Sequence, residues 1–509
     1  MVMKMSRRTF LMQSGMAAAA TMLPASVRAS NSTGLRVRLA HDLLRPQYHL
    51  MPAANWMNDP NGPIFHKGRY HMFFQYNPNA SVWGNMHWAH SSSPDMIHWK
   101  HEPVAIAPTP NGWDRDGVFS GCIVLDGAIP AAIYTGVLPP DTPANATLKD
   151  GQHTWREVQC LAHSHDAHLR TWQKLADPIL ARPPAGLAVT GFRDPCVWRE
   201  GNGWRMAVGS GFAGKGGAVF LYSSPDLRQW TYLNPLVEGR STGQTGTNPV
   251  DTGDMWECPD FFPLGDRHVL LISTMGKVLW KSGHYDGKHL TAEREGVVDH
   301  GAYYAERSML DRDGNRVLWG WIPERRPEAE HRAAGWAGVM SLPRVLSLDS
   351  DGQLEMVPAP VIEKLRGAPA RVRGAEADAK EKLDAMRIHD LAAELYVECA
   401  PDRPFTVDLK SETGAPFAEI AYHPAANGGE LRVNNTHATV STPKDEALHL
   451  QAFVDASVLE IFVNRTTTIT ERIYTAVPEA LCISMSSASS LRSFALWPIK
   501  PISRDRLTT

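Results

Sequence analysis

Short apolar runs separated by glycine turns recur through the first two thirds of the chain and predict β-hairpins. In three places a motif that combines a carboxylate with a proline stands directly before such a hairpin. Because glycine turns between β-rich runs are typical of hairpins, each motif is predicted to begin an equivalent strand. The motifs are residues 56–62 with Asp59, residues 192–195 with Asp194 and residues 256–260 with Glu257, and their turns lie at residues 67–68, 201–203 and 265–266.

A second kind of hairpin interleaves with the first. It joins an apolar run, a polar turn and an aromatic or apolar anchor. It occurs at residues 89–99, 162–172 and 221–230, with a weaker match at residues 284–290. Two further strand starts, at residues 119–122 and 306–308, precede turns at residues 126–127 and 313–314. Together these hairpins define five units between about residues 41 and 348. Units that recur at roughly 50 to 75 residues are near the blade period of β-propellers.

Five blades around one axis would place every first strand against a central funnel, so that the three acids converge on one pocket. The alternative is an ordinary β-sandwich in which the turns match by coincidence. Matching offsets in five units favour the propeller.

The last third of the chain has a different pattern. Residues 351–384 are rich in Ala, Glu, Lys and Arg and predict a linker with one short helix. Residues 385–509 contain short runs with period-2 alternation, which is typical of a β-sandwich. No acidic cluster stands out in this domain, so we expect its role to be structural. The predicted protein is therefore all-β, with a five-bladed β-propeller at residues 30–350 followed by a C-terminal β-sandwich.

The composition excludes several classes of partner and cofactor. The chain has 51 basic and 54 acidic residues, a net charge of -3, which gives no field for nucleic acid or a membrane surface. None of its 6 cysteines has CxxC spacing, so we expect buried thiols and no zinc site. The alternation at residues 163–165 could suggest a metal, but it is more typical of an exposed strand edge. We expect neither a metal nor a cofactor.

The first 29 residues resemble a twin-arginine signal peptide. Arg7 and Arg8 precede a mildly apolar stretch at residues 15–23, and small residues before Ser30 fit a cleavage site. A disordered cytosolic leader is the alternative. The signal predicts a secreted or periplasmic protein, and no other stretch approaches the roughly 20 apolar residues that span a bilayer.

Three converging acids without a metal motif fit one kind of chemistry. Retaining glycoside hydrolysis needs a carboxylate nucleophile and a carboxylic acid, about 5 to 5.5 Å apart. The acid needs a raised pKa, whereas the nucleophile must stay ionised. A third carboxylate can stabilise the electron-deficient ring of the transition state.

The three motifs resemble the signatures of glycoside hydrolase family 32. The likeness extends from about residue 45 to residue 500, and its further segments are residues 75–78, 83–84, 119–121, 319–321, 338–344 and 455–464. The resemblance implies a five-bladed propeller followed by a β-sandwich, in agreement with the repeat count. It also implies cleavage of β-fructofuranosides with retention.

The resemblance implies a role for each acid. Asp59 matches the nucleophile, Glu257 the acid/base and Asp194 the transition-state stabiliser. Cys258, directly after the acid/base, would tune Glu257. The residues expected to bind substrate are Trp56, Asn58, Gln75, Trp83, Phe119, Ser120 and Arg193.

Alternatives remain open at this point. A fructosyltransferase would use the same covalent intermediate, a non-catalytic fructan-binding protein would keep the pocket, and a propeller scaffold would not need the acids. The substrate is expected to be sucrose or a fructan such as inulin or levan. In the family that the motifs resemble, sucrose-preferring plant members carry an Asp–Lys pair shortly after the acid/base motif. Here Lys277 has no clear Asp partner, which favours fructans slightly, and the export signal disfavours sucrose 6-phosphate. The sequence does not indicate an oligomeric state.

Overall fold

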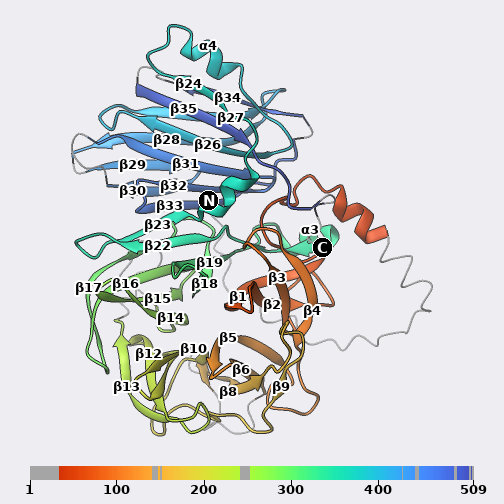
Figure 1. Ribbon diagram of the computed structural model, residues 1–509, viewed down its shortest axis with the longest axis vertical. Helices are drawn as coiled ribbons and strands as arrows, with labels where there is room; N and C mark the ends of the chain where they lie inside the picture. The colour runs from red at the N-terminus through yellow and green to blue at the C-terminus, as the bar shows by residue number, and fades with distance from the viewer. Residues whose placement is uncertain are drawn as a thin grey trace.

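The computed structural model of the protein describes residues 34–509 except residues 140–146, 150–151, 241–252, 427, 442–445, 478, 487–489, 504–505 and 507–509. The predicted signal peptide at residues 1–29 lies outside the described residues. Figure 1 shows a ring of five sheets below and a pair of packed sheets above. The predicted all-β class, a five-bladed propeller followed by a β-sandwich, is confirmed.

Each of the five propeller sheets is antiparallel within its main path, and the sheets follow the chain in order. Blade 1 consists of β1 (Asn55–His66), β2 (Arg69–Asn77), β3 (His87–Ser93) and β4 (Lys100–Ile106). Blade 2 consists of β5 (Gly117–Asp126), β6 (Ile129–Leu138), β7 (Thr147–Lys149), β8 (Gln152–His163) and β9 (Gln173–Lys174). Blade 3 consists of β10 (Phe192–Glu200), β11 (Gly203–Phe212), β12 (Gly216–Ser224) and β13 (Thr231–Glu238).

The remaining blades complete the ring. Blade 4 consists of β14 (Glu257–Leu264), β15 (Arg267–Thr274), β16 (Lys277–Tyr285) and β17 (Leu290–Val297). Blade 5 consists of β18 (Tyr304–Leu310), β19 (Arg316–Ile322), β21 (Val339–Met340), β22 (Arg344–Leu348) and β23 (Leu354–Pro358). The first strands β1, β5, β10, β14 and β18 contact one another in sequence around the axis, and β18 contacts β1. The ring is closed by β20 (Trp336–Ala337), which follows α3 (Glu328–Ala334) and pairs parallel with β1.

The propeller core is divided among the blade interfaces. Each of five apolar clusters combines side chains of two neighbouring blades, as where Phe73 of blade 1 packs with Tyr134 of blade 2. Because a blade is apolar on both faces, it is stable only between its neighbours. The position of each first strand therefore depends on the whole ring.

The outer hairpins of the five blades contain the same type of turn. In each, an aspartate carboxylate accepts hydrogen bonds from two backbone amides two to four residues further on. This local bonding explains why the turn recurs in the sequence. Four of these turns coincide with the second repeat, and the fifth, in blade 5, has no aromatic anchor and escaped the pattern. The aspartates are Asp95, Asp166, Asp226, Asp286 and Asp349.

The upper body is a sandwich of two six-stranded sheets around one continuous apolar core. The first sheet contains β24 (Ala370–Arg373), β35 (Leu491–Pro498), β26 (Ala392–Cys399), β31 (Leu448–Asp455), β32 (Val458–Val463) and β33 (Thr467–Arg472). The second contains β25 (Arg387–Ile388), β34 (Leu481–Ser486), β27 (Phe405–Ser411), β28 (Pro416–Ala425), β29 (Gly428–Val433) and β30 (Thr436–Val440).

The expected linker at residues 351–384 contains parts of both bodies. Its first strand, β23, pairs with β22, so the expected boundary at residue 350 falls inside blade 5. Its other strand, β24, is an edge of the sandwich. Between them lies η2 (Pro360–Leu365), and the expected short helix is α4 (Ala379–Asp384). In the part of the chain that the structure describes, no helix is long and apolar enough to cross a membrane.

A buried charged cluster joins the two bodies. Asp455 and Glu460 of the sandwich bond to the two ring nitrogens of His49, at 2.7 and 2.9 Å. Arg344 of blade 5 bonds to Glu460 at 2.5 Å and to Asp299 at 2.9 Å. The sequence pattern shows no acidic cluster in this domain, because Asp455 and Glu460 come together with Asp299, which lies outside the sandwich, only in the folded protein.

Candidate active site

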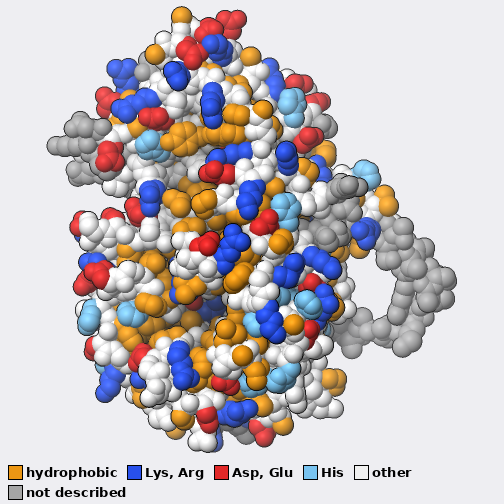
Figure 2. Space-filling view, in the orientation of Figure 1, with side chains coloured by type: hydrophobic (Ala, Val, Ile, Leu, Met, Phe, Trp, Pro, Cys, Tyr) orange, Lys and Arg blue, Asp and Glu red, His pale blue; other side chains and the backbone are white. Residues whose placement is uncertain are grey.

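All five first strands carry a β-bulge at the axis. In each, two residues of the first strand face one residue of the second strand, and the ladder register shifts accordingly. Bulges redirect side chains without ending the strand. They turn the motif residues toward the centre, where Figure 2 shows a hollow rimmed mainly by hydrophobic side chains. The bulge pairs are residues 58–59, 119–120, 194–195, 258–259 and 305–306.

The three acids occupy different places in these bulges. Asp194 is the first bulge residue, Asp59 is the second, and Glu257 stands immediately before its bulge. The prediction that the motifs begin equivalent strands is confirmed. The prediction of one shared position for the acids is wrong at the level of single residues. Each acid occupies a different position relative to the bulge of its own strand.

The Asp59 carboxylate is held by two donors. Asn58 Nδ2 donates to Oδ1 at 2.9 Å, and Ser120 Oγ donates to Oδ2 at 2.6 Å. Burial raises the pKa of Asp59, the hydrogen bonds from Ser120 and Asn58 oppose the rise, and the charge of Glu257 adds to it. Both donors orient and stabilise the anion that a nucleophile requires.

Asp194 is a buried acid whose pKa is strongly raised. It is 4% exposed, and its Oδ2 accepts a hydrogen bond from the backbone N–H of Cys258 at 3.0 Å. Burial raises its pKa to about 7, against the opposing charge of Arg193 and with the repulsion of Asp59 and Glu257. The acids therefore interact strongly, and their protons belong to the cluster as a whole.

Glu257 is held between a cation and a phenol. Arg193 Nη2 donates to Oε1 at 2.8 Å, and the Tyr304 hydroxyl donates to Oε2 at 2.5 Å. Arg193 also donates to Glu157 at 2.9 Å, and its Nε lies 3.9 Å from Asp194. Burial acts to lower the pKa of Arg193, but Glu157, Glu257 and Asp194 raise it well above its ordinary value. One guanidinium thus connects three carboxylates.

The sequence pattern did not indicate Glu157 or Tyr304. Glu157 lies on the third strand of blade 2 and is 1% exposed, and its other oxygen accepts from the Phe192 N–H at 2.6 Å. Tyr304 opens the first strand of blade 5. Neither residue belongs to a motif, and only the predicted start of the fifth unit near residue 306 lay close to one of them.

Cys258 lies between two of the acids. Its Sγ is 3.7 Å from Asp59 Oδ2 and 3.6 Å from Asp194 Oδ2. Burial, followed by the charges of Asp194 and Asp59, raises the pKa of the thiol well above its ordinary value, so it stays protonated and acts as a donor. The sequence predicted an effect on Glu257, whereas the structure places the thiol beside the other two acids.

Three of the predicted binding residues, Trp56, Trp83 and Phe119, belong to one apolar cluster with Trp321. Trp83 and Phe119 meet edge to face at 5.9 Å, and Trp56 packs against Trp321 at 5.8 Å. Trp56, one of the residues expected to bind substrate, is 6% exposed, and its indole N–H donates to Asn58 at 2.7 Å. Its visible role is to orient the Asn58 amide that holds Asp59.

Gln75 lies opposite the bulge of blade 1 and is 2% exposed. Its Nε2 donates to the carbonyl of Val118 in blade 2 at 3.0 Å, so part of the side chain joins two blades. Among the described residues, no group of three or more His, Cys, Asp or Glu is arranged to hold a metal ion.

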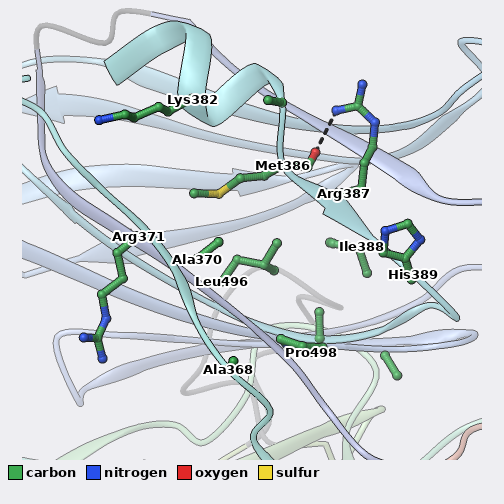
Figure 3. A pocket seen from close by; sticks show the side chains of 13 residues that line it. Ala368, Ala370, Arg371, Lys382, Met386, Arg387, Ile388, His389, Leu496 and Pro498 are labelled. Carbon is green, nitrogen blue, oxygen red and sulfur yellow. Dashed lines mark hydrogen bonds between the residues drawn. The ribbon is translucent and has the colours of Figure 1, made fainter. Parts of the chain in front are cut away.

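Another cavity, of about 630 Å³, lies in the sandwich. Its floor is aliphatic, with Ala370, Ile388 and Leu496, and the charged ends of Arg371 and Lys382 point in different directions (Figure 3). Lys382 is already paired with Glu376 at 2.5 Å. None of the three acids lines this cavity, so the axial hollow is the candidate active site.

Comparison with known proteins gives matches over both bodies of the structure. The model described as the glycosyl hydrolases family 32 N-terminal domain matches residues 49–358, and that of the C-terminal domain matches residues 362–498. A sucrose-6-phosphate hydrolase of Escherichia coli is 34% identical over 492 residues, which cover 89% of this chain and 94% of the relative. A raffinose invertase of Escherichia coli is 36% identical over 456 residues, which cover 84% and 89%.

Two solved structures share the whole arrangement. Fructan 1-exohydrolase IIa from Cichorium intybus has a TM-score of 0.75 at 26% identity, over 90% of this chain and 98% of that chain. A β-fructofuranosidase mutant from Bombyx mori in complex with sucrose has a TM-score of 0.75 at 26% identity, over 95% and 100%.

Proposed function

The chain belongs to glycosyl hydrolase family 32, and we propose that it hydrolyses β-fructofuranosidic bonds with retention, through a covalent fructosyl-enzyme intermediate. The family resemblance of the sequence motifs is confirmed, and the protein is a glycoside hydrolase. The observation that carries the mechanism is the single buried cluster in which Arg193 and Cys258 connect all three acids.

Asp59 is the nucleophile in this proposal. Its carboxylate attacks the anomeric carbon of fructose and forms a C–O bond as the bond to the leaving oxygen breaks. Ser120 and Asn58 hold both carboxylate oxygens, so the attacking group is oriented before substrate arrives. A positioned nucleophile avoids the entropy cost of alignment in the transition state.

Glu257 is the acid/base. As a carboxylic acid it gives its proton to the leaving oxygen, and as a carboxylate it then takes a proton from the attacking water. Tyr304 suits both states, because a phenol can donate to the carboxylate or accept from the acid. Arg193 stabilises the anion that the first proton transfer leaves.

Asp194 stabilises the transition state. Its negative charge lies in a buried, poorly solvated cluster, where attraction to an oxocarbenium-like ring is stronger than in water. Its raised pKa reflects the same lack of solvation and the nearby acids.

We propose sucrose or a fructan as the substrate, hydrolysed outside the cytoplasm. The relatives named raffinose invertase and fructan 1-exohydrolase support such substrates, and the predicted signal at residues 1–29 supports export. Relatives named sucrose-6-phosphate hydrolase make the phosphorylated sugar the main competitor. Fructosyl transfer and non-catalytic binding are the rival functions, and the presence of all three acids disfavours the second.

The deciding experiment incubates the purified protein with sucrose, sucrose 6-phosphate, inulin and levan, and sizes the products. Free fructose from an unphosphorylated sugar supports the proposal. Longer oligosaccharides would establish the transferase, and a strict requirement for the phosphate would overturn the export argument. If the protein binds a sugar but converts none of them, it is a binding protein and not an enzyme.

Stereochemistry tests the covalent intermediate separately. Turnover in the presence of methanol should give methyl β-fructofuranoside, because two inversions restore the original configuration. The α-anomer would exclude the intermediate. The Asp59→Asn variant, which keeps the side-chain shape, is the matched control for contaminating activity.

A further inference from the structure

The backbone at the axis adopts a conformation that most residues avoid. Asp194, Cys258 and Ala305 open the bulges of blades 3, 4 and 5 with φ values of 63°, 51° and 53°. These values lie in the left-handed region, which is uncommon for residues other than glycine. Such conformations persist only where surrounding groups hold them. The position of the Asp194 carboxylate therefore depends on what holds its peptide groups.

The N–H of Asp194 is held by Thr135 of blade 2. It donates to Thr135 Oγ1 at 2.9 Å, and Thr135 lies on the second strand, opposite the bulge of its own blade. The Thr135 hydroxyl gives its proton to Gln159 Oε1 at 2.9 Å, so its lone pair is left to face Asp194. Gln159 in turn donates to the carbonyl of Phe192, two residues before Asp194.

The carbonyl of Asp194 is held by Arg307 of blade 5. Arg307 Nη2 donates to this oxygen at 3.1 Å, and Nη1 donates to the carbonyl of Pro259 at 2.5 Å. Pro259 is the second bulge residue of blade 4, beside Cys258. Both Thr135 and Arg307 are almost fully buried, at 0% and 2% exposed. One residue of the active site is thus fastened at both peptide ends by side chains from two other blades.

We propose that Thr135 and Arg307 are positioning residues that hold Asp194 in its left-handed conformation and thereby set where its carboxylate lies relative to Asp59 and Glu257. Neither side chain bonds to a catalytic carboxylate, so both act through the backbone. The inference rests on the proposed function of Asp194 for its effect on turnover, but not for its effect on the backbone.

The main test compares Thr135→Val with Thr135→Ser. Valine keeps the shape and removes the acceptor, whereas serine keeps the acceptor. With sucrose as substrate, we expect Thr135→Val to lower kcat by roughly 10- to 100-fold with KM nearly unchanged, since a misplaced catalytic group costs factors of this size. Thr135→Ser should restore most of the rate.

The pH profile separates positioning from mere stability. An Asp194 side chain that leaves the cluster moves away from Asp59 and Glu257 and gains solvent, so its raised pKa falls. The ascending limb of kcat/KM should therefore move to lower pH in Thr135→Val and stay in place in Thr135→Ser. A structural role alone would lower the melting temperature and leave the limb where it is.

Ser273→Ala is the matched control for lost stability. Ser273 Oγ accepts from the left-handed N–H of Ala305 at 2.9 Å, in the same way that Thr135 serves Asp194. Both substitutions leave one buried bulge N–H without its acceptor, so their melting temperatures should fall by similar amounts. The fall in kcat should be larger for Thr135→Val, because it displaces Asp194 itself, whereas Ser273→Ala reaches the acids only through Tyr304, the residue before Ala305.

Arg307→Lys and Arg307→Met test the carbonyl side. Lysine reaches one carbonyl and methionine neither, so kcat should fall in the order arginine, lysine, methionine. If Arg307→Met does not fold, the lysine variant and the Thr135 pair still decide the question.

Amide hydrogen exchange of the peptide that contains Asp194 measures how firmly its backbone is held, and it does not depend on enzyme activity. Faster exchange in Thr135→Val than in Thr135→Ser supports the proposal even if the wild-type protein hydrolyses none of the sugars, which would refute only the proposed function. Equal exchange in both variants overturns the proposal. In an active protein, a kcat within about two-fold of wild type with an unmoved pH limb also overturns it.

Discussion

One cluster of buried carboxylates lies on the propeller axis and another lies between propeller and sandwich, and the pKa values of Asp194 in the first and Glu460 in the second move in opposite directions. On the axis, burial raises the pKa of Asp194 to about 7 despite Arg193. At the interface, burial also disfavours the anion of Glu460, but Arg344 and His49 hold its pKa at about 2.

The number of partners explains the difference. At the interface, Asp455 accepts from the backbone N–H groups of residues 47, 48 and 49 and from His49, and Glu460 accepts from Arg344, His49 and the N–H of Leu342. On the axis, Arg193 serves three carboxylates at once. The interface satisfies its charges, whereas the axis leaves negative charge in excess. That excess is what a cationic transition state can use.

The largest expected effect comes from the axis. Asp59→Asn and Glu257→Gln should each lower kcat by several orders of magnitude, because they remove the proposed nucleophile and the proposed acid/base. The melting temperature should stay the same or rise, since each amide relieves repulsion in the cluster. Steady-state kinetics and calorimetry check this, and near-wild-type rates in either variant would refute its role.

At the interface, removal of a charged side chain should lower the stability of the fold. Arg344→Met removes the arginine from buried Asp299 and leaves buried Glu460 with His49 as its remaining cation, which should lower the free energy of unfolding by about 3 to 5 kcal/mol. Arg465→Met is the matched control, because its ion pair with Glu355 joins the same two bodies but is 55% exposed at the arginine. It should cost less than about 1 kcal/mol. Equal losses in denaturant unfolding would contradict the comparison.

The stability of the interface should depend on pH in a defined window. Burial would lower the pKa of His49, but its bonds to Asp455 and Glu460 raise it from 6.5 to about 9. A histidine with a raised pKa stabilises the fold fully below its unfolded value of 6.5, and this contribution is lost as the pH rises toward 9. The shift corresponds to about 3 kcal/mol. Melting temperatures measured from about pH 6 to about pH 9.5 should fall, and the fall should be smaller in His49→Gln.

The smallest expected effect concerns the sharing of Arg193. Glu157→Gln removes one of its three carboxylate partners and one negative charge, so the pKa of Asp194 should drop from about 7. The ascending limb of the kcat/KM profile should then move to lower pH, with a modest change in the maximum. An unmoved limb would show that Glu157 does not influence the acids.

The fold was predictable because its signals are local. Glycine turns and aspartate turns need only neighbouring residues, and their repetition along the chain is enough to define five blades. The acids themselves stood out because each lies one or two residues before a proline in a repeated motif. Only the position of each acid relative to its bulge could not be predicted from the sequence, because the bulge depends on how the first strand pairs with the second.

The supporting groups could not be found in this way. Glu157, Thr135 and Tyr304 come from blades other than those of the acids that they serve, and no spacing along the chain connects them. Likewise, Asp455 and Glu460 read as ordinary strand residues until His49 and Arg344 face them. Partners that meet only through the closed ring leave no trace in a local pattern.

Ring closure has a consequence for synthesis. The strand that bears Asp59 gains its second neighbour only when Trp336 and Ala337 reach it, long after it has left the ribosome. A nascent chain therefore carries Asp59 on a strand with an open edge until blades 2 to 4 and the first two strands of blade 5 have emerged. A chain truncated before β20 would leave β1, the strand that bears Asp59, without its pairing partner on one edge.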